Sequence, residues 1–88
     1  MKKADKSLKL LLLNVRSYLN NKNTLEYLII NGGFDIIVLT ETWLKRSVTI
    51  PTTSYKTLDL LSLNERGKGI RIIYKSSFIV TPISKYES

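Results

Sequence analysis

Two short apolar runs constrain the fold of this chain more than any other feature. Residues 8–14 read LKLLLLN, and residues 36–40 read IIVLT. Each run is too short for a stable helix and suits a buried strand, and the second is rich in the β-branched residues that strands favour. The runs therefore predict two core strands near the start of one small domain.

A helix is expected between these two strands. Leu25, Leu28 and Ile29 follow the i, i+3, i+4 spacing of one helix face, and Thr24 can cap the helix start. The Asn-Gly-Gly sequence at 31–33 ends the helix, since glycine adopts the left-handed conformation at little cost. The order strand, helix, strand predicts a right-handed βαβ unit with parallel strands.

The second half of the chain predicts a less regular arrangement. Residues 45–69 read mostly as loop, with a short strand within 57–63 and a turn at 65–69. Residues 70–74 predict a further strand, and the alternation over 77–83 predicts another. The fold class is therefore α/β. We expect a basic tail at residues 1–7 and one domain over 8–88.

The charge balance indicates a polyanionic partner. Fourteen basic residues against seven acidic ones give a net charge of +7. Nucleic acid is the first expectation and an anionic membrane surface the second. A basic surface with no specific partner explains the charge equally well.

Two residue types are missing from the composition. The chain has no cysteine and no histidine, which excludes disulfides, thiolate metal sites and imidazole as a general base. A bound metal would be a hard cation on oxygen ligands, such as Mg²⁺. The start resembles a signal peptide but lacks a cleavage site, and no apolar stretch approaches the roughly 20 residues of a membrane span. We expect an intracellular protein without a membrane partner.

Polar residues close both predicted core strands. Asn14 ends the first strand and Glu41 follows the second. Because parallel strands of a βαβ unit end at the same sheet edge, the two side chains are expected to lie close together. A carboxylate there can bind Mg²⁺, which accepts one or two carboxylates and keeps several waters. The alternative is that Glu41 caps the next turn and Asn14 caps a loop.

The sequence around these residues resembles that of a known family. The stretches LKLLLLNVRSYLNNK, FDIIVLTETWL and ERGKGIRIIYK, in this order and spacing, resemble the endonuclease domain of non-LTR (LINE-type) retrotransposons. That domain belongs to the exonuclease-endonuclease-phosphatase superfamily. The resemblance covers residues 8–78, about the first third of a family domain.

The resemblance implies a fold and a reaction. The family fold is a four-layer α/β/β/α sandwich, of which this chain would be an N-terminal fragment. Glu41 matches the metal-binding glutamate and Asn14 the asparagine beside it, so both are candidate catalytic and metal-site residues. The implied reaction of the intact family domain is hydrolysis of a DNA phosphodiester with Mg²⁺ or Mn²⁺, which nicks DNA to prime a reverse transcriptase in the same polyprotein, in the nucleus. The alternative is that the fragment alone binds no metal.

The chain departs from the family pattern in several places. The family's Asp-x-Asn pair and Ser-Asp-His sequence lie further along than these residues, so we expect little or no nuclease activity from the 88 residues alone. Arg66, Gly67 and Gly69 match a glycine-rich turn, but Lys68 replaces a glycine. Arg71 replaces a small apolar strand residue, and its burial without a partner would be costly.

A non-catalytic nucleic-acid-binding module is the alternative function. The resemblance and the charge together suggest a basic surface near the strand ends, formed by Arg16, Lys45, Arg46, Arg66 and Lys68, with Arg71 and Lys75 as further members. Trp43 is expected to pack beneath a loop instead of contacting DNA. A phosphatase acting on phosphoinositides or nucleotides is a weaker third hypothesis.

Overall fold

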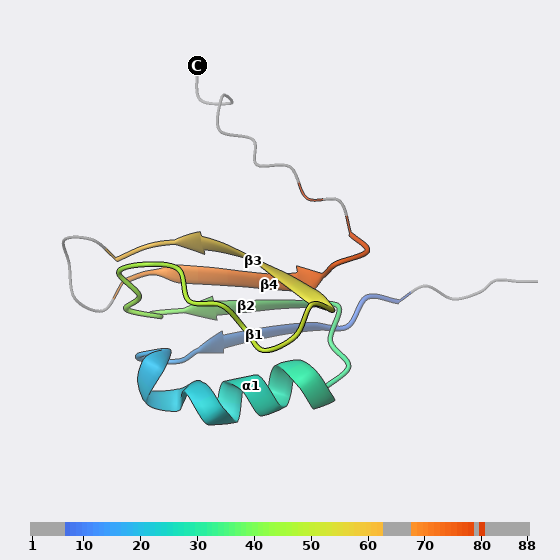
Figure 1. The fold of residues 1–88 in the computed structure, drawn as a ribbon, viewed down its shortest axis with the longest axis horizontal. Coiled ribbons are helices and arrows are strands. Elements are labelled where there is room, and N and C mark those ends of the chain that lie inside the picture. The colour runs from blue at the N-terminus through green and yellow to red at the C-terminus, as the bar shows by residue number, and fades with distance from the viewer. Residues whose placement is uncertain (1–6, 63–67, 79, 81–88) are drawn as a thin grey trace, which may run out of the picture.

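The computed structural model describes residues 7–62, 68–78 and 80. In these residues the chain forms a four-stranded sheet with one α-helix, so the α/β class is confirmed (Figure 1). The elements in chain order are β1 (Leu10–Asn14), a 3-10 turn (Leu19–Asn21), α1 (Lys22–Asn31), β2 (Ile36–Thr40), β3 (Tyr55–Leu60) and β4 (Ile70–Lys75). Most of the predicted basic tail lies outside the described residues.

The sheet has the strand order β1-β2-β4-β3. β1 and β2 are parallel, as the βαβ prediction requires, and β4 pairs antiparallel with both β2 and β3. Asn14 lies opposite Thr40, Thr40 opposite Ile70, and Ile70 opposite Leu60. The carboxyl ends of β1, β2 and β3 therefore meet the start of β4 at one end of the sheet. We call the residues at this end, 14–17, 41–44 and 68–69, the rim.

The helix begins earlier than the sequence predicted. α1 starts at Lys22, and Asn21 is its N-cap without a side-chain capping bond, so the prediction that Thr24 caps the helix is wrong. The 3-10 turn leads directly into the helix, and Lys22 forms an i, i+4 ion pair with Glu26 at 2.8 Å. At the other end, Gly33 takes the left-handed conformation with φ of 69°, as expected for a glycine helix stop.

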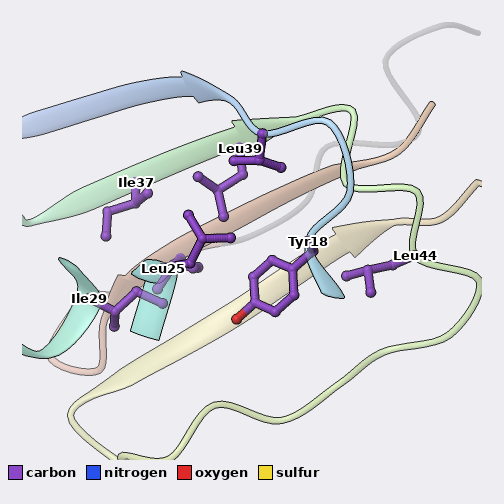
Figure 2. Packing of buried hydrophobic residues seen from close by; sticks show 8 residues of the cluster. Tyr18, Leu25, Ile29, Ile37, Leu39 and Leu44 are labelled. Carbon is purple, nitrogen blue, oxygen red and sulfur yellow. The ribbon is translucent and has the colours of Figure 1, made fainter. Parts of the chain in front are cut away.

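The core lies on one face of the sheet, beneath α1 and the segment that follows β2. Figure 2 shows labelled side chains of this core, with Ile29 and Leu25 beside the helix and Leu44 on the segment after β2. The members of the core are Val15, Tyr18, Leu25, Ile29, Ile37, Leu39, Leu44 and Ile73. Leu25 and Ile29 come from the apolar stripe that predicted the helix.

The opposite face of the sheet is apolar and uncovered by the described residues. The sequence predicts a buried β1, but its side chains alternate between half-buried and exposed, and Leu12 is 68% exposed. The reason is that α1 and the segment after β2 pack on the other face only. We call this surface the open face; its apolar members are Leu10, Leu12, Ile36, Val38, Leu58, Leu60, Ile70 and Ile72.

The strand predicted at 77–83 falls mostly outside the described residues. Its described residues, 77, 78 and 80, form a turn, a bend and irregular chain. Among the described residues, no helix has the length and apolar character needed to cross a membrane.

Candidate active site at the rim of the sheet

The structure brings Asn14 and Glu41 together at the rim. Asn14 Nδ2 donates a hydrogen bond of 2.9 Å to Glu41 Oε2. The guanidinium of Arg16 lies near the other carboxylate oxygen, with Nε 3.9 Å from Oε1. The Glu41 side chain is 36% exposed, so the carboxylate remains open to solvent and to a ligand. This is the proximity expected for residues that end adjacent parallel strands.

Backbone hydrogen bonds extend the β1–β2 pairing beyond the strands and fix this geometry. The N–H groups of Val15, Ser17 and Tyr18 donate to the carbonyls of residues 40–42 at 3.0, 2.9 and 2.8 Å. Both loops that carry the polar side chains are therefore held by the main chain. The Asn14–Glu41 contact does not depend on the side chains alone.

Backbone strain is concentrated at the rim. In the described residues, the four non-glycine residues with positive φ are Arg16 (47°), Ser17 (90°), Glu41 (55°) and Trp43 (59°). Each such residue costs on the order of 1–3 kcal/mol and persists only where surrounding contacts enforce it. Strain of this kind collects at active and binding sites, and here it coincides with the candidate site.

Gly69 allows the third rim segment to approach. The Thr42 N–H donates to the Gly69 carbonyl at 3.1 Å, and the Trp43 N–H donates to the Lys68 carbonyl at 2.8 Å. Gly69 has φ of 105°, and a Cβ there would lie 2.5 Å from the buried Thr42 Oγ1. The glycine of the predicted turn is thus required beside the Glu41 loop. Arg66 and Gly67 lie outside the described residues.

Asn21 is a rim-supporting residue that the sequence reasoning missed. Its Nδ2 donates to the carbonyls of Val15 and Ser17, both at 3.0 Å, which holds the loop after β1. In the sequence the residue stands out only as part of a polar stretch. An asparagine directly before a helix was the available signal, because that side chain commonly bonds to nearby backbone.

Trp43 does not pack beneath the loop, so that prediction is wrong. The residue is 39% exposed, whereas Thr42 and Leu44 on either side of it are buried. Leu44, the next residue in the chain, belongs to the buried core.

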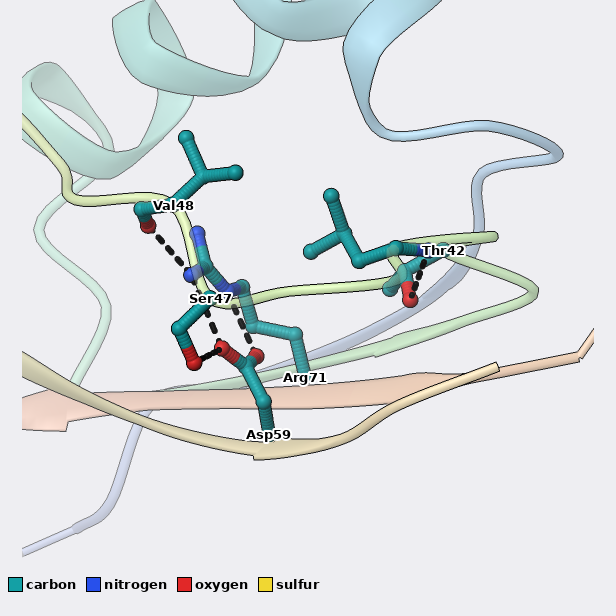
Figure 3. Close-up of polar contacts among 6 residues, drawn as sticks. Thr42, Ser47, Val48, Asp59 and Arg71 are labelled. Atoms are coloured by element: carbon teal, nitrogen blue, oxygen red, sulfur yellow. Dashed lines mark hydrogen bonds and ion pairs between the residues drawn. The ribbon is translucent and has the colours of Figure 1, made fainter. Parts of the chain in front are cut away.

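Arg71 is buried in an ion pair and does not belong to a basic surface, so that prediction is wrong. Its Nε lies 2.7 Å from Asp59 Oδ1, and its Nη2 lies 3.0 Å from Oδ2. Nη2 also donates to the Val48 carbonyl, and Ser47 Oγ donates to Asp59 Oδ2 at 2.7 Å (Figure 3). The guanidinium lies 4.8 Å from the centre of the Tyr18 ring. The pair therefore fastens the segment after β2 to the sheet.

The surroundings of this pair shift the pKa values of three groups. Burial raises the pKa of Asp59, but the hydrogen bonds from Arg71 and Ser47 outweigh burial and leave the pKa below its usual value. Burial lowers the pKa of Arg71, and the contacts with Asp59 outweigh that effect and raise it. Burial raises the pKa of Tyr18, against a smaller opposing effect of the Arg71 charge. All three groups keep their usual charge near neutral pH.

The remaining predicted basic residues divide between the two ends of the sheet. Arg16, Lys45, Arg46 and Lys68 are exposed and lie in or next to the rim segments. Lys75 ends β4 at the far end, where its Nζ lies 2.9 Å from Asp35 Oδ1. The prediction that Lys75 joins the same basic surface is therefore wrong.

The donor set of the rim suits a weakly held hard cation. The described residues contain no group of three or more Asp, Glu, His or Cys residues placed to hold a metal. Glu41 offers one solvent-open carboxylate, and Asn14 offers an amide beside it. Mg²⁺ fits such a site, because it accepts a single carboxylate and fills its other positions with water and substrate phosphate.

Comparison of the chain with protein-family models finds no match, and comparisons with curated proteins and with solved structures find none either.

Proposed function

We propose that this chain carries the opening part of a divalent-metal-dependent endonuclease domain of the non-LTR retrotransposon type. The observation that carries the proposal is the 2.9 Å bond between Asn14 and Glu41 at the ends of adjacent parallel strands. The quoted sequence resemblance assigns a role to the same two residues. The positive φ of Glu41 further supports the proposal, because strained backbone is common at functional sites.

Different residues of the rim have different roles in binding a DNA phosphodiester. Glu41 holds Mg²⁺ or Mn²⁺ through its exposed carboxylate, and Asn14 orients that carboxylate through Nδ2. A bound divalent ion supplies positive charge against the phosphate. The exposed cations Arg16, Lys45 and Lys68 add electrostatic attraction for the DNA backbone.

The proposal also explains the open face. Eight apolar residues on four strands form a surface that would serve as one inner face of the proposed four-layer α/β/β/α sandwich. In such a sandwich a second sheet packs about 10 Å away. A contiguous apolar patch that the described residues leave uncovered often marks an interface. The remainder of the domain and a reverse transcriptase are then the proposed partners within one polyprotein, acting on DNA in the nucleus.

We expect these 88 residues to bind metal and DNA without nicking DNA. The chain contains no histidine, so the rim has no imidazole to assist proton transfer or stabilise the transition state. General acid–base assistance contributes about 10²–10⁴-fold. Incubation with supercoiled plasmid and Mg²⁺ is expected to leave the plasmid intact. Nicking that disappears in Glu41→Ala would contradict this expectation.

Terbium luminescence tests the metal site directly. Trp43 is the only tryptophan in the chain and lies two residues from Glu41, so light absorbed by the indole will sensitise Tb³⁺ bound at the rim. We expect a saturable signal that Mg²⁺ competes away. Glu41→Gln is expected to weaken Tb³⁺ binding at least about tenfold, because it removes the carboxylate that a hard cation requires.

Glu26→Gln is the matched control. It is the same substitution on α1, where Glu26 pairs with Lys22 instead of lying at the rim. Equal loss of signal in both variants, or none in Glu41→Gln, would refute the metal site.

A metal-free nucleic-acid-binding module is the second candidate. The grouping of four exposed cations around the rim favours it. Binding to DNA would then survive a chelator and the Glu41→Gln substitution. It would still weaken with salt, by a log–log slope of about −0.9 per neutralised phosphate.

A further inference from the structure

Trp43 projects from a firmly anchored segment of the rim. Its neighbours Thr42 and Leu44 are 1% and 2% exposed, while Trp43 itself is 39% exposed. The backbone on both sides is therefore fixed in the protein interior, and the indole is presented at the surface. An exposed tryptophan held in this way loses little conformational freedom when a ligand binds.

The backbone of Trp43 is maintained in an uncommon conformation. Its φ of 59° is rare for a bulky residue. The Trp43 N–H bond to the Lys68 carbonyl and the Thr42 N–H bond to the Gly69 carbonyl enforce this conformation. A Cβ on Gly69 would lie 3.3 Å from the Trp43 nitrogen, so the glycine permits the close approach. The strained backbone at Trp43 and the close approach permitted by Gly69 together hold the ring at the surface.

Basic residues lie next to Trp43 in the chain and on the neighbouring rim segments. Lys45 and Arg46 follow it directly and are exposed. Lys68 lies on the segment that Trp43 bonds to, and the Arg16 guanidinium lies 3.9 Å from Glu41. An exposed aromatic side chain among cations is the arrangement that binds single-stranded nucleic acid, with bases stacked on the ring and phosphates near the charges.

We propose that Trp43 stacks on an unpaired nucleobase of a DNA strand whose backbone lies across the rim. The inference rests on the proposed function in that it places DNA at the rim. Since bases in an intact duplex are already stacked on each other, the rim prefers DNA that is single-stranded, frayed or locally opened. Trp43 is thereby a specificity-determining residue that selects the structure of the DNA.

The intrinsic fluorescence of Trp43 reports the contact without a label. A short oligo(dT) added to the full chain in the presence of a chelator is expected to quench the fluorescence to a saturating level. An abasic oligonucleotide of equal length keeps the phosphates but lacks bases, and it is expected to bind more weakly and quench little. The chelator keeps this measurement independent of any metal at Glu41.

Variants separate stacking from charge. By anisotropy of labelled oligonucleotides, Trp43→Leu is expected to bind oligo(dT) about tenfold more weakly and to bind the abasic strand like the unmodified protein. Trp43→Phe keeps an aromatic face and is expected to retain most of the affinity. Tyr27→Leu is the matched control, because Tyr27 is an exposed aromatic residue on α1, and its affinity is expected to be unchanged.

Three outcomes would overturn the proposal. The first is an unchanged affinity of Trp43→Leu for oligo(dT), and the second is equal quenching by the abasic strand. The third is an emission spectrum that shifts with protein concentration in the absence of DNA, because that would place the ring in a contact between copies of the chain. None of these outcomes affects Tb³⁺ binding that depends on Glu41. Conversely, if Tb³⁺ does not bind at Glu41 but quenching still depends on the bases, the metal site is refuted and the stacking proposal stands.

Discussion

Replacing Asp59 with asparagine is expected to remove a large part of the stability of this chain. The Asp59 side chain is 3% exposed and the Arg71 side chain is fully buried. The substitution removes the negative charge and replaces one of the two acceptor oxygens with an NH₂ group, so at most one of the two bonds, of 2.7 and 3.0 Å, remains and the guanidinium is left buried without a counter-charge. Breaking a buried pair costs about 3–5 kcal/mol. A chain of 88 residues has a total stability of about 4–13 kcal/mol, so the variant approaches the unfolding threshold.

Urea denaturation followed by circular dichroism measures this loss. The matched control is Asp35→Asn, which removes a more exposed carboxylate from its pair with Lys75 and is expected to shift the midpoint far less. The double variant Asp59→Leu with Arg71→Met is expected to recover most of the lost stability. An apolar pair of similar volume often replaces a buried ion pair at little cost.

Acid provides an independent measure of the same pair. The pKa of Asp59 is held below its usual value, so the stabilisation is complete above the unfolded-state pKa of about 3.9 and is lost as pH falls through the lower folded-state pKa. The unmodified chain is expected to lose stability below about pH 4 more steeply than Asp59→Asn. Surface ion pairs contribute at most about 1 kcal/mol. The reasoning would be refuted if Asp59→Asn lowered the free energy of unfolding at neutral pH by less than this.

Two further predictions concern the rim and the open face. Gly69→Ala is expected to destabilise the chain by about 1–3 kcal/mol, because it forces a Cβ against Thr42 Oγ1 at a positive φ; an unchanged urea midpoint would contradict this. Leu12→Lys combined with Leu60→Lys is expected to reduce self-association in sedimentation velocity without lowering the urea midpoint, since both side chains are largely exposed, at 68% and 67%. A midpoint that falls sharply would show that these leucines are packed.

Sequence alone was sufficient for those parts of the fold that depend on local pattern. The β2 run, the glycine stop of α1 and the parallel pairing of β1 with β2 follow from residue spacing, turn chemistry and the handedness of βαβ units. The proximity of Asn14 and Glu41 follows from the same pairing, because it needs only the rule that parallel strands end together.

The sequence did not predict features that depend on partners distant in the chain. Arg71 is acceptable in its strand because Asp59, twelve residues earlier, lies opposite it across the β3–β4 pair. Nothing in the spacing of the two residues indicates that register. The burial predicted for Trp43 is wrong because large aromatic residues are usually buried, whereas here left-handed backbone turns this ring outward. The half-exposed character of β1 depends on which face α1 covers, and a four-leucine run does not reveal that.

The order of strands in space differs from their order in the chain, and this affects how the protein is made. β4 is the last of the four strands to be synthesised, yet it lies between β2 and β3 and provides the only hydrogen-bonded neighbour of β3 in the described residues. On the ribosome, β1, α1 and β2 can assemble as they emerge, but β3 stays unpaired until residue 75 has left the exit tunnel. The nascent chain therefore passes through a stage with an unpaired β2 edge, at which chaperones would be most needed.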